Sequence, residues 1–174
     1  MKSILILGGA RCVWGDVGSL GQWPAKVDVA AVNDVGAQWP GSLIFWASLH
    51  PRKLKKWEKL RKNKGHPDGY EKYGNKYGRP MVDHIVEDWG GSSGLFAVKI
   101  ALLLGYEQIV LAGIPMEAAE GHYFNNKDWK QCDQYRAGWG RHETEIKPYV
   151  RSCSGWTMRL LGAPDIQCAN ATVL

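Results

Sequence analysis

The sequence predicts an α/β protein with a Rossmann-like, doubly wound and mostly parallel sheet. The first observation behind this prediction is a short apolar run at residues 3–7, which ends at Gly8 and Gly9 as a strand buried on both faces would. The second is that similar runs recur along the chain with helix-length segments between them, which is typical of parallel strands joined by crossovers. The length of 174 residues is that of about one domain, so we expect a single Rossmann-like domain over residues 1–174.

Apolar patterning gives the order of the elements. We expect strands at residues 27–32, 43–47 and 109–112, weaker strands at 84–87 and 165–168, and helices at 54–61, 95–104 and 145–161. The last helix is weakened by Ser154 and Gly155 in its middle. Two segments lack a helical or strand period: residues 65–80, which we expect to form a surface loop, and residues 115–141, which we expect to form a lid.

Composition excludes several classes of protein. Hydrophobic residues make up 45% and charged residues 22% of the chain, which excludes a disordered polymer. No apolar run reaches the length that a membrane-spanning helix or a signal peptide needs, so we expect no membrane span and a cytoplasmic location. The four cysteines form no Cys-x-x-Cys pair, and we therefore expect free thiols rather than a zinc site or a disulfide framework.

A basic run lies between Arg52 and Lys64. It holds eight lysine or arginine residues and one acidic residue, Glu58, in a chain whose net charge is +5. Such a run could bind a polyanion such as nucleic acid. The alternative is a solvated helix face whose lysine stems cover apolar neighbours.

The loops that follow the first two predicted strands contain candidate binding residues. Gly8 and Gly9 would let backbone N–H groups approach a phosphate, and Arg11 could add positive charge, although a plain tight turn explains the same residues. Asn33 follows the second strand and could bind a nucleobase or ribose edge through its amide. Its alternative role is a turn or helix cap.

A third candidate site is the start of the predicted helix at 95–104. Ser92, Ser93 and Gly94 precede a helix that is apolar almost all round, so its N–H groups would face an anion or a sugar hydroxyl at the sheet edge. The alternative is a serine cap with small residues for close packing. His142 ends the lid segment and could act as a general base, or could simply be a surface residue.

The block from Ser92 to Met116, SSGLFAVKIALLLGYEQIVLAGIPM, resembles the central motif of bacterial sialyltransferases of glycosyltransferase family 42. In that family a serine-glycine turn opens an apolar helix that ends in leucine-glycine-tyrosine, and a strand ending in glycine and isoleucine follows. The block is also similar to one in the flagellar-accessory and hydroxymethylpterin pyrophosphokinase-like proteins.

The resemblance implies a Rossmann-like transferase that binds a cytidine monophosphate sugar without a metal cofactor. The matching ligand-binding positions are Gly8, Gly9, Asn33, Ser92, Ser93 and Gly94. By the resemblance, His142 is the general base that takes a proton from an acceptor hydroxyl, and Tyr123 is a lid tyrosine near the phosphate. The first loop departs from the family, because it lacks the asparagine and the proline usually found there.

Two other functions fit the sequence. One is phosphoryl or pyrophosphoryl transfer, as in the pterin kinase-like proteins, for which Asp83 and Asp88 are the candidate magnesium ligands. The other is a nucleotide-binding or nucleic-acid-binding module without catalysis, in which the Arg52 to Lys64 run contacts the nucleic acid.

Overall fold

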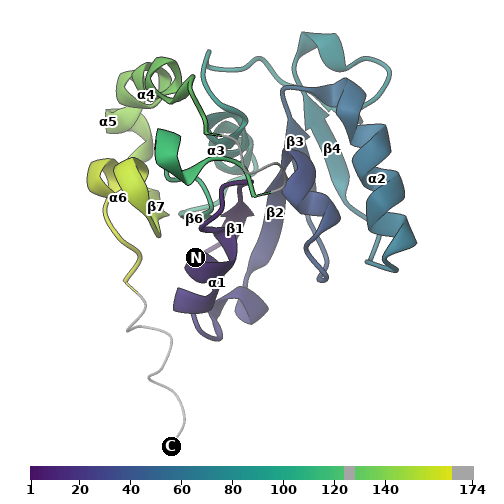
Figure 1. Cartoon of the computed structure of the whole chain (residues 1–174), viewed down its shortest axis with the longest axis horizontal. Helices are drawn as coiled ribbons and strands as arrows, with labels where there is room; N and C mark the ends of the chain where they lie inside the picture. The colour runs from purple at the N-terminus through teal and green to yellow at the C-terminus, as the bar shows by residue number, and fades with distance from the viewer. Residues whose placement is uncertain (124–127, 166–174) are drawn as a thin grey trace, which may run out of the picture.

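The computed structural model describes residues 1–123 and 128–165 and contains an α/β fold with one parallel sheet (Figure 1). Its seven strands lie in the order β5-β4-β3-β2-β1-β6-β7, and every neighbouring pair is parallel. The strands are β1 (Ser3–Leu7), β2 (Asp28–Val32), β3 (Phe45–Ser48), β4 (Glu71–Gly74), β5 (His84–Ile85), β6 (Gln108–Ala112) and β7 (Val150–Ser152). The Rossmann-like fold class predicted from the sequence is thus confirmed.

The order of the strands creates a crevice beside β1. From β1 the chain adds β2, β3, β4 and β5 outward on one side, and then returns to place β6 on the other side of β1. The loops that leave β1 and β6 therefore lead away in opposite directions. In open parallel sheets, ligands bind at such a reversal, outside the carboxyl ends of the strands.

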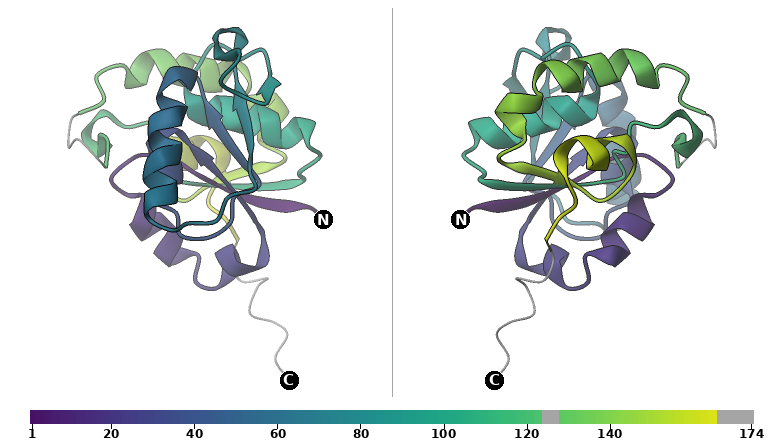
Figure 2. Two further views of the ribbon diagram at one scale, coloured as in Figure 1. Left: turned by 90° about the vertical axis from the view of Figure 1, so that its right-hand side faces the viewer. Right: turned by 90° about the vertical axis from the view of Figure 1, so that its left-hand side faces the viewer.

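Helices cover both faces of the sheet. They are α1 (Val13–Ser19), α2 (Leu54–Asn63), α3 (Ser93–Leu103), α4 (Cys132–Arg141), α5 (Glu143–Ile146) and α6 (Gly155–Leu161), with short 3-10 helices η1 (Trp23–Lys26), η2 (Asn33–Ala37), η3 (Pro51–Lys53), η4 (Lys76–Gly78) and η5 (Ala118–Glu120). Figure 2 shows α1 and α2 on the opposite side of the sheet from α3. No helix among the described residues is long and apolar enough to cross a membrane.

The alternation of side chains along β1 explains why its sequence is apolar throughout. Ile4 and Ile6 pack into the core beneath α3, whereas Leu5 and Leu7 pack into the core on the side of α1. Successive side chains of a strand point to opposite faces, and both faces here are covered. Helix α3 is buried around most of its circumference, and Cys132 and Trp139 of α4 belong to the same hydrophobic core.

Three expectations about elements were wrong. The segment 115–141, which we expected to lack a helical period, ends in the helix α4. Strand β4 lies inside the segment 65–80 that we expected to be a loop, and its sequence, EKYG, has one apolar residue that reaches the core, Tyr73. The expected helix at 145–161 is instead α5, β7 and α6, because β7 pairs with β6 and Gly155 starts α6 with a φ of +66°. The strand expected at 165–168 lies outside the described residues, except for Asp165, which belongs to no strand.

Candidate functional site

A pocket of about 230 Å³ opens at the carboxyl edge of the sheet, and we call it the edge pocket. Its walls are the loops that follow β1, β2, β3 and β6, the start of α3, and part of the segment between η5 and α4. Six residues singled out from the sequence line it: Gly8, Gly9, Asn33, Ser92, Ser93 and Gly94. Its volume lies just below the usual range for small-molecule sites, about 300–1,000 Å³.

Close backbone packing explains the glycines after β1. A Cβ on Gly8 would lie 2.3 Å from Ile114 Cγ1 and 2.4 Å from the carbonyl oxygen of Gly113, so the loops after β1 and β6 can touch only if residue 8 is glycine. The N–H of Gly8 donates to the carbonyl of Ala112 at 2.8 Å. By contrast, the N–H of Gly9 makes no hydrogen bond within the described residues, which leaves it available to a ligand.

The start of α3 is capped and still offers free donors. Ser92 Oγ accepts hydrogen bonds from the N–H of Leu95 at 3.3 Å and from Trp139 Nε1 at 3.1 Å. Ser92 therefore caps the helix, which is the alternative role that the sequence allowed. Within the described part of the chain, the N–H groups of Ser93 and Gly94 have no acceptor. These two N–H groups lie at the positive end of the helix dipole and line the pocket, as an anion site requires.

Asn33 is held in a left-handed backbone conformation, with a φ of +56°. Its side-chain Oδ1 accepts a hydrogen bond from Ser48 Oγ at 2.8 Å, and its carbonyl accepts one from Trp46 Nε1 at 2.5 Å. The Nδ2 amide donates to no described residue. Met116, on the opposite wall, also has a positive φ, of +51°. Strained backbone of this kind is concentrated at binding sites, where the surrounding structure holds it in place.

Two pocket residues that carry chemistry, Asp34 and His122, were not singled out from the sequence. Measured from the position that a Cβ on Gly9 would occupy, Asp34 Oδ1 lies at 3.1 Å and His122 Nδ1 at 3.9 Å. Asp34 follows Asn33 directly, and His122 reaches the pocket because residue 122 forms an antiparallel bridge with Ala10. Asp34 could have been predicted as a site residue, because a carboxyl group follows a buried strand there. The bridge that brings His122 to the pocket cannot be predicted from the sequence.

Burial perturbs the pKa values of two groups that line the pocket, Asp34 and His50. Burial raises the pKa of Asp34, although its electrostatic interactions with His122 and Lys53 act in the opposite direction. The pKa of His50, which also lines the pocket, is lowered by burial and by Lys53. Groups with shifted pKa values in a cleft are typical of functional sites, because they can hold or release a proton near neutral pH.

An aromatic wall faces the glycine loop. The ring of Trp129 lies 5.3 Å from that of Tyr135 and 6.0 Å from that of His122, measured between centroids. These residues come from the segment 115–141 that we expected to form a lid, and they line the pocket together with Gln131. Flat rings beside free N–H donors suit a ligand that combines a planar ring with an anionic group.

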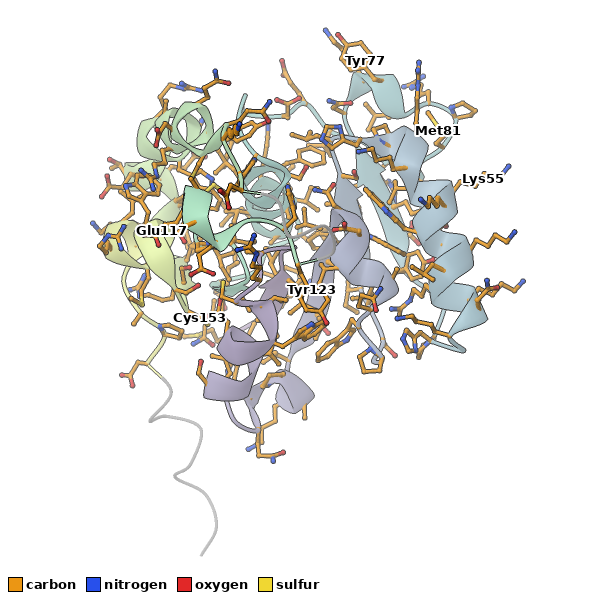
Figure 3. The ribbon with its side chains drawn as sticks, in the orientation of Figure 1. Lys55, Tyr77, Met81, Glu117, Tyr123 and Cys153 are labelled. Atoms are coloured by element: carbon orange, nitrogen blue, oxygen red, sulfur yellow. The ribbon has the colours of Figure 1, made fainter. Side chains whose placement is uncertain are left out.

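Three residues singled out from the sequence do not line the edge pocket. His142 lies between α4 and α5, where its ring stacks on Trp89 at 4.2 Å and its Nδ1 lies 3.1 Å from Glu145 Oε2. Arg11 turns to the segment after η5, where its guanidinium lies 3.7 Å from Asp128. Tyr123 lies beside α1 (Figure 3), where its ring packs edge-on against that of Trp14, and its N–H donates to the carbonyl of Gly9.

The candidate magnesium ligands are used elsewhere. Asp83 accepts a hydrogen bond from the N–H of Lys72, and Asp88 accepts one from the N–H of Gly90. Neither of them lines the edge pocket, in which Asp34 is the sole carboxylate among the described residues. The part of the chain that the structure describes holds no cluster of three or more histidine, cysteine, aspartate or glutamate side chains arranged for a metal ion.

A buried aspartate fixes the loop after β6. Asp16 Oδ2 accepts hydrogen bonds from the N–H of Gly113 at 2.8 Å and from Ser154 Oγ at 2.7 Å. Nearby, burial raises the pKa of the Cys12 and Cys153 thiols to about 12, so neither is a reactive thiolate at neutral pH. This cluster supports the pocket wall, because Gly113 is one of the residues that line it.

The raised pKa of Asp34 predicts a stability effect that depends on pH. Because the folded state binds this proton more tightly than the unfolded chain, the stabilisation is fully present below pH 3.8 and is lost as the pH rises through the raised pKa. We therefore expect Asp34→Asn to unfold at a higher temperature than wild type at pH 7, with the difference closing as the pH falls below 4. Thermal unfolding between pH 3 and pH 8 measures this. The exposed Asp68→Asn is the control, and an equal gap at every pH would contradict the prediction.

Comparison with known proteins identifies no relative for this architecture. No family model matches the chain, and neither the search of curated proteins nor the search of solved structures found a significant match.

Proposed function

We propose that the protein is a transferase that binds a nucleotide-activated sugar, of the cytidine monophosphate type, in the edge pocket and transfers the sugar to an acceptor hydroxyl. One observation carries the proposal: free N–H donors and a pair of proton-carrying side chains lie on the same small cavity. The donors are the backbone N–H groups of Gly9, Ser93 and Gly94, and the pair is Asp34 and His122.

The donors suit the phosphate of such a ligand. Backbone N–H groups at a helix start and in a glycine loop stabilise negative charge without a metal ion. In glycosyl transfer, this charge grows on the phosphate as the sugar leaves, so the same contacts would favour the transition state over the ground state. The aromatic wall of Trp129 and Tyr135 offers a face for the base, and the Nδ2 donor of Asn33 offers a polar partner.

The proposed chemical step uses His122 as general base. His122 takes the proton of the acceptor hydroxyl while the hydroxyl oxygen forms a bond to the anomeric carbon of the sugar. The bond between that carbon and the phosphate oxygen breaks, and its electron pair leaves on the nucleotide. Asp34, on the same side of the pocket, would orient and stabilise the imidazolium that forms. The base role therefore moves from His142, which the resemblance suggested, to a histidine that lines the cavity.

Phosphoryl transfer is less well supported by the same pocket. That reaction uses magnesium ions held by several carboxylates, whereas Asp83 and Asp88 lie away from the cavity and bind backbone N–H groups.

The binding part of the proposal is tested by thermal unfolding with cytidine, uridine and adenosine monophosphates in the absence of magnesium. At a concentration 100-fold above Kd, the preferred nucleotide should raise the unfolding temperature by about 5–10 °C. Gly9→Ala should weaken binding at least tenfold, because its methyl group would enter the pocket 3.1 Å from Asp34 Oδ1. Gly15→Ala is the matched control, since a Cβ there meets nothing within 4 Å. The absence of a shift with every nucleotide would refute the proposal.

A further inference from the structure

A second cavity, of about 330 Å³, adjoins the edge pocket, and we call it the side cavity. The two share Leu49 and His50, which follow β3. The side cavity is also lined by Pro51, Arg52 and Lys53 of η3 and by Tyr77 of η4. A molecule that occupied both cavities would pass His50 on the way.

The cations that line the side cavity, Arg52 and Lys53, have no acidic partner at ion-pair distance in the described part of the chain. Arg52 and Lys53 are exposed, and their side chains form no ion pair or hydrogen bond among the described residues. Other surface cations do have partners, such as Lys147, whose ammonium lies 2.8 Å from Glu143 Oε1. No acidic residue of the described chain lines the side cavity, which favours an anionic ligand there.

An aromatic side chain stands beside these charges. Tyr77 is 69% exposed and projects from the protein surface (Figure 3). The ammonium of Lys76 lies 5.2 Å from the centre of its ring. A large exposed ring next to unpaired cations suits a ligand with an apolar or sugar face and an anionic group.

The hollow along α2 provides a contrast. It is lined by lysines, including Lys55, Lys59 and Lys62, but four carboxylates line it as well: Glu58, Asp68, Glu71 and Asp83. The ammonium of Lys72, also in this hollow, lies 3.1 Å from Glu58 Oε1. Its charges therefore largely cancel, whereas those of the side cavity do not.

We infer that the side cavity binds the anionic group, a phosphate or a carboxylate, of the acceptor substrate, with Arg52 and Lys53 as its partners. This inference rests on the proposed function, because it takes the edge pocket as the donor site. A hydroxyl of the same acceptor then reaches past His50 toward His122. The charge of Lys53 also acts on the pKa values of Asp34 and His50. An anion bound beside Lys53 would therefore change the electrostatics of the edge pocket.

The test is a titration of the ¹⁵N-labelled protein, followed by amide chemical shifts, with glucose, glucose 6-phosphate and glucuronate. The amides of Arg52, Lys53 and Tyr77 report the side cavity, and those of Gly9, Ser93 and Gly94 report the edge pocket. We expect saturable shifts at the side-cavity amides with one or both anionic sugars, and binding at least tenfold weaker with glucose. The phosphate and carboxylate arms identify which anion is preferred.

Two double variants distinguish specific binding of the anion in the side cavity from non-specific attraction to the positive charge of the protein. Arg52→Gln with Tyr77→Ala should weaken anion binding about tenfold or more, while Lys59→Gln with Lys62→Gln, which removes more charge from α2, should change it less than twofold. Equal weakening by both variants, or equal binding of glucose and the anions, would overturn the inference. The edge-pocket amides and a parallel nucleotide titration report independently on the proposed function, so failure of the side cavity alone leaves that proposal standing.

Discussion

His122→Ala is expected to lower turnover of a nucleotide-activated sugar by about 10²–10⁴-fold while leaving nucleotide affinity within about threefold of wild type. A general base contributes a rate factor of this size, and it acts on the acceptor hydroxyl rather than on the bound nucleotide. The side chain lies on the edge pocket beside Asp34, and its backbone bridge to Ala10 does not require the imidazole. Release of the free nucleotide, followed by ³¹P NMR, measures turnover, and calorimetry measures affinity.

Two further histidine variants make this experiment decisive. His66→Ala removes a histidine that lies after α2 and does not line the pocket, and it should leave turnover unchanged. His142→Ala tests which histidine is the general base: the family resemblance suggests His142, whereas the geometry of the pocket favours His122. Because the ring of His142 stacks on Trp89 and faces Glu145, we expect its loss to affect turnover far less than the loss of His122. Loss of turnover in His142→Ala with normal turnover in His122→Ala would reverse the assignment.

The second large effect is expected at Arg61, whose replacement by methionine should lower the free energy of unfolding by about 3 kcal/mol or more. Arg61 is 0% exposed. Its guanidinium donates hydrogen bonds to the carbonyl oxygens of Gly36, Trp39, Gly41 and Pro67, at 2.6–2.9 Å. Methionine fills similar space but leaves these four carbonyls without their donor, and buried unpaired polar groups are costly.

Urea unfolding followed by circular dichroism measures this effect, and Lys62→Met is the matched control. Lys62 is the next residue of α2 and is exposed, so its substitution should change the free energy of unfolding by less than about 0.5 kcal/mol. If Arg61→Met also changed the free energy of unfolding by less than about 0.5 kcal/mol, the prediction would be wrong, and water would have to hydrate the four carbonyls in place of the guanidinium. The basic run at residues 52–64 therefore has two kinds of residue. Arg61 is buried and bonds α2 to the backbone around η2, whereas the lysines are exposed to solvent.

Much of the candidate site could be predicted from local sequence. Glycines after an apolar run, an asparagine after the next, and a serine-glycine start to an apolar helix each mark the end of a strand or the start of a helix. Because parallel strands end at one edge of a sheet, these local signals converge there, and Gly8, Asn33 and Ser93 do line one cavity. The roles of the two serine hydroxyl groups in capping α3 and binding Leu49 were visible only with the neighbours in place.

The residues that carry charge and protons were harder to predict, because their positions depend on contacts between distant segments. The sequence pointed to His142 and not to His122, yet the bridge between residues 10 and 122 brings His122 to the pocket, whereas the ring of His142 stacks on Trp89 and does not line it. The side cavity likewise exists because η4 packs near η3, so that Tyr77 and Arg52 line the same cavity.

For this protein, apolar periodicity and glycine placement alone were enough to specify a parallel, doubly wound sheet, the greater part of its strands, and the edge of the sheet at which the edge pocket opens. These features follow from local rules, since a strand covered on both faces must be apolar throughout and a close turn must be glycine. Short strands such as β4 and β7, the choice between two histidines and the pairing of charges come from long-range packing. Their energies depend on which distant groups share a buried surface, and a linear pattern does not encode that.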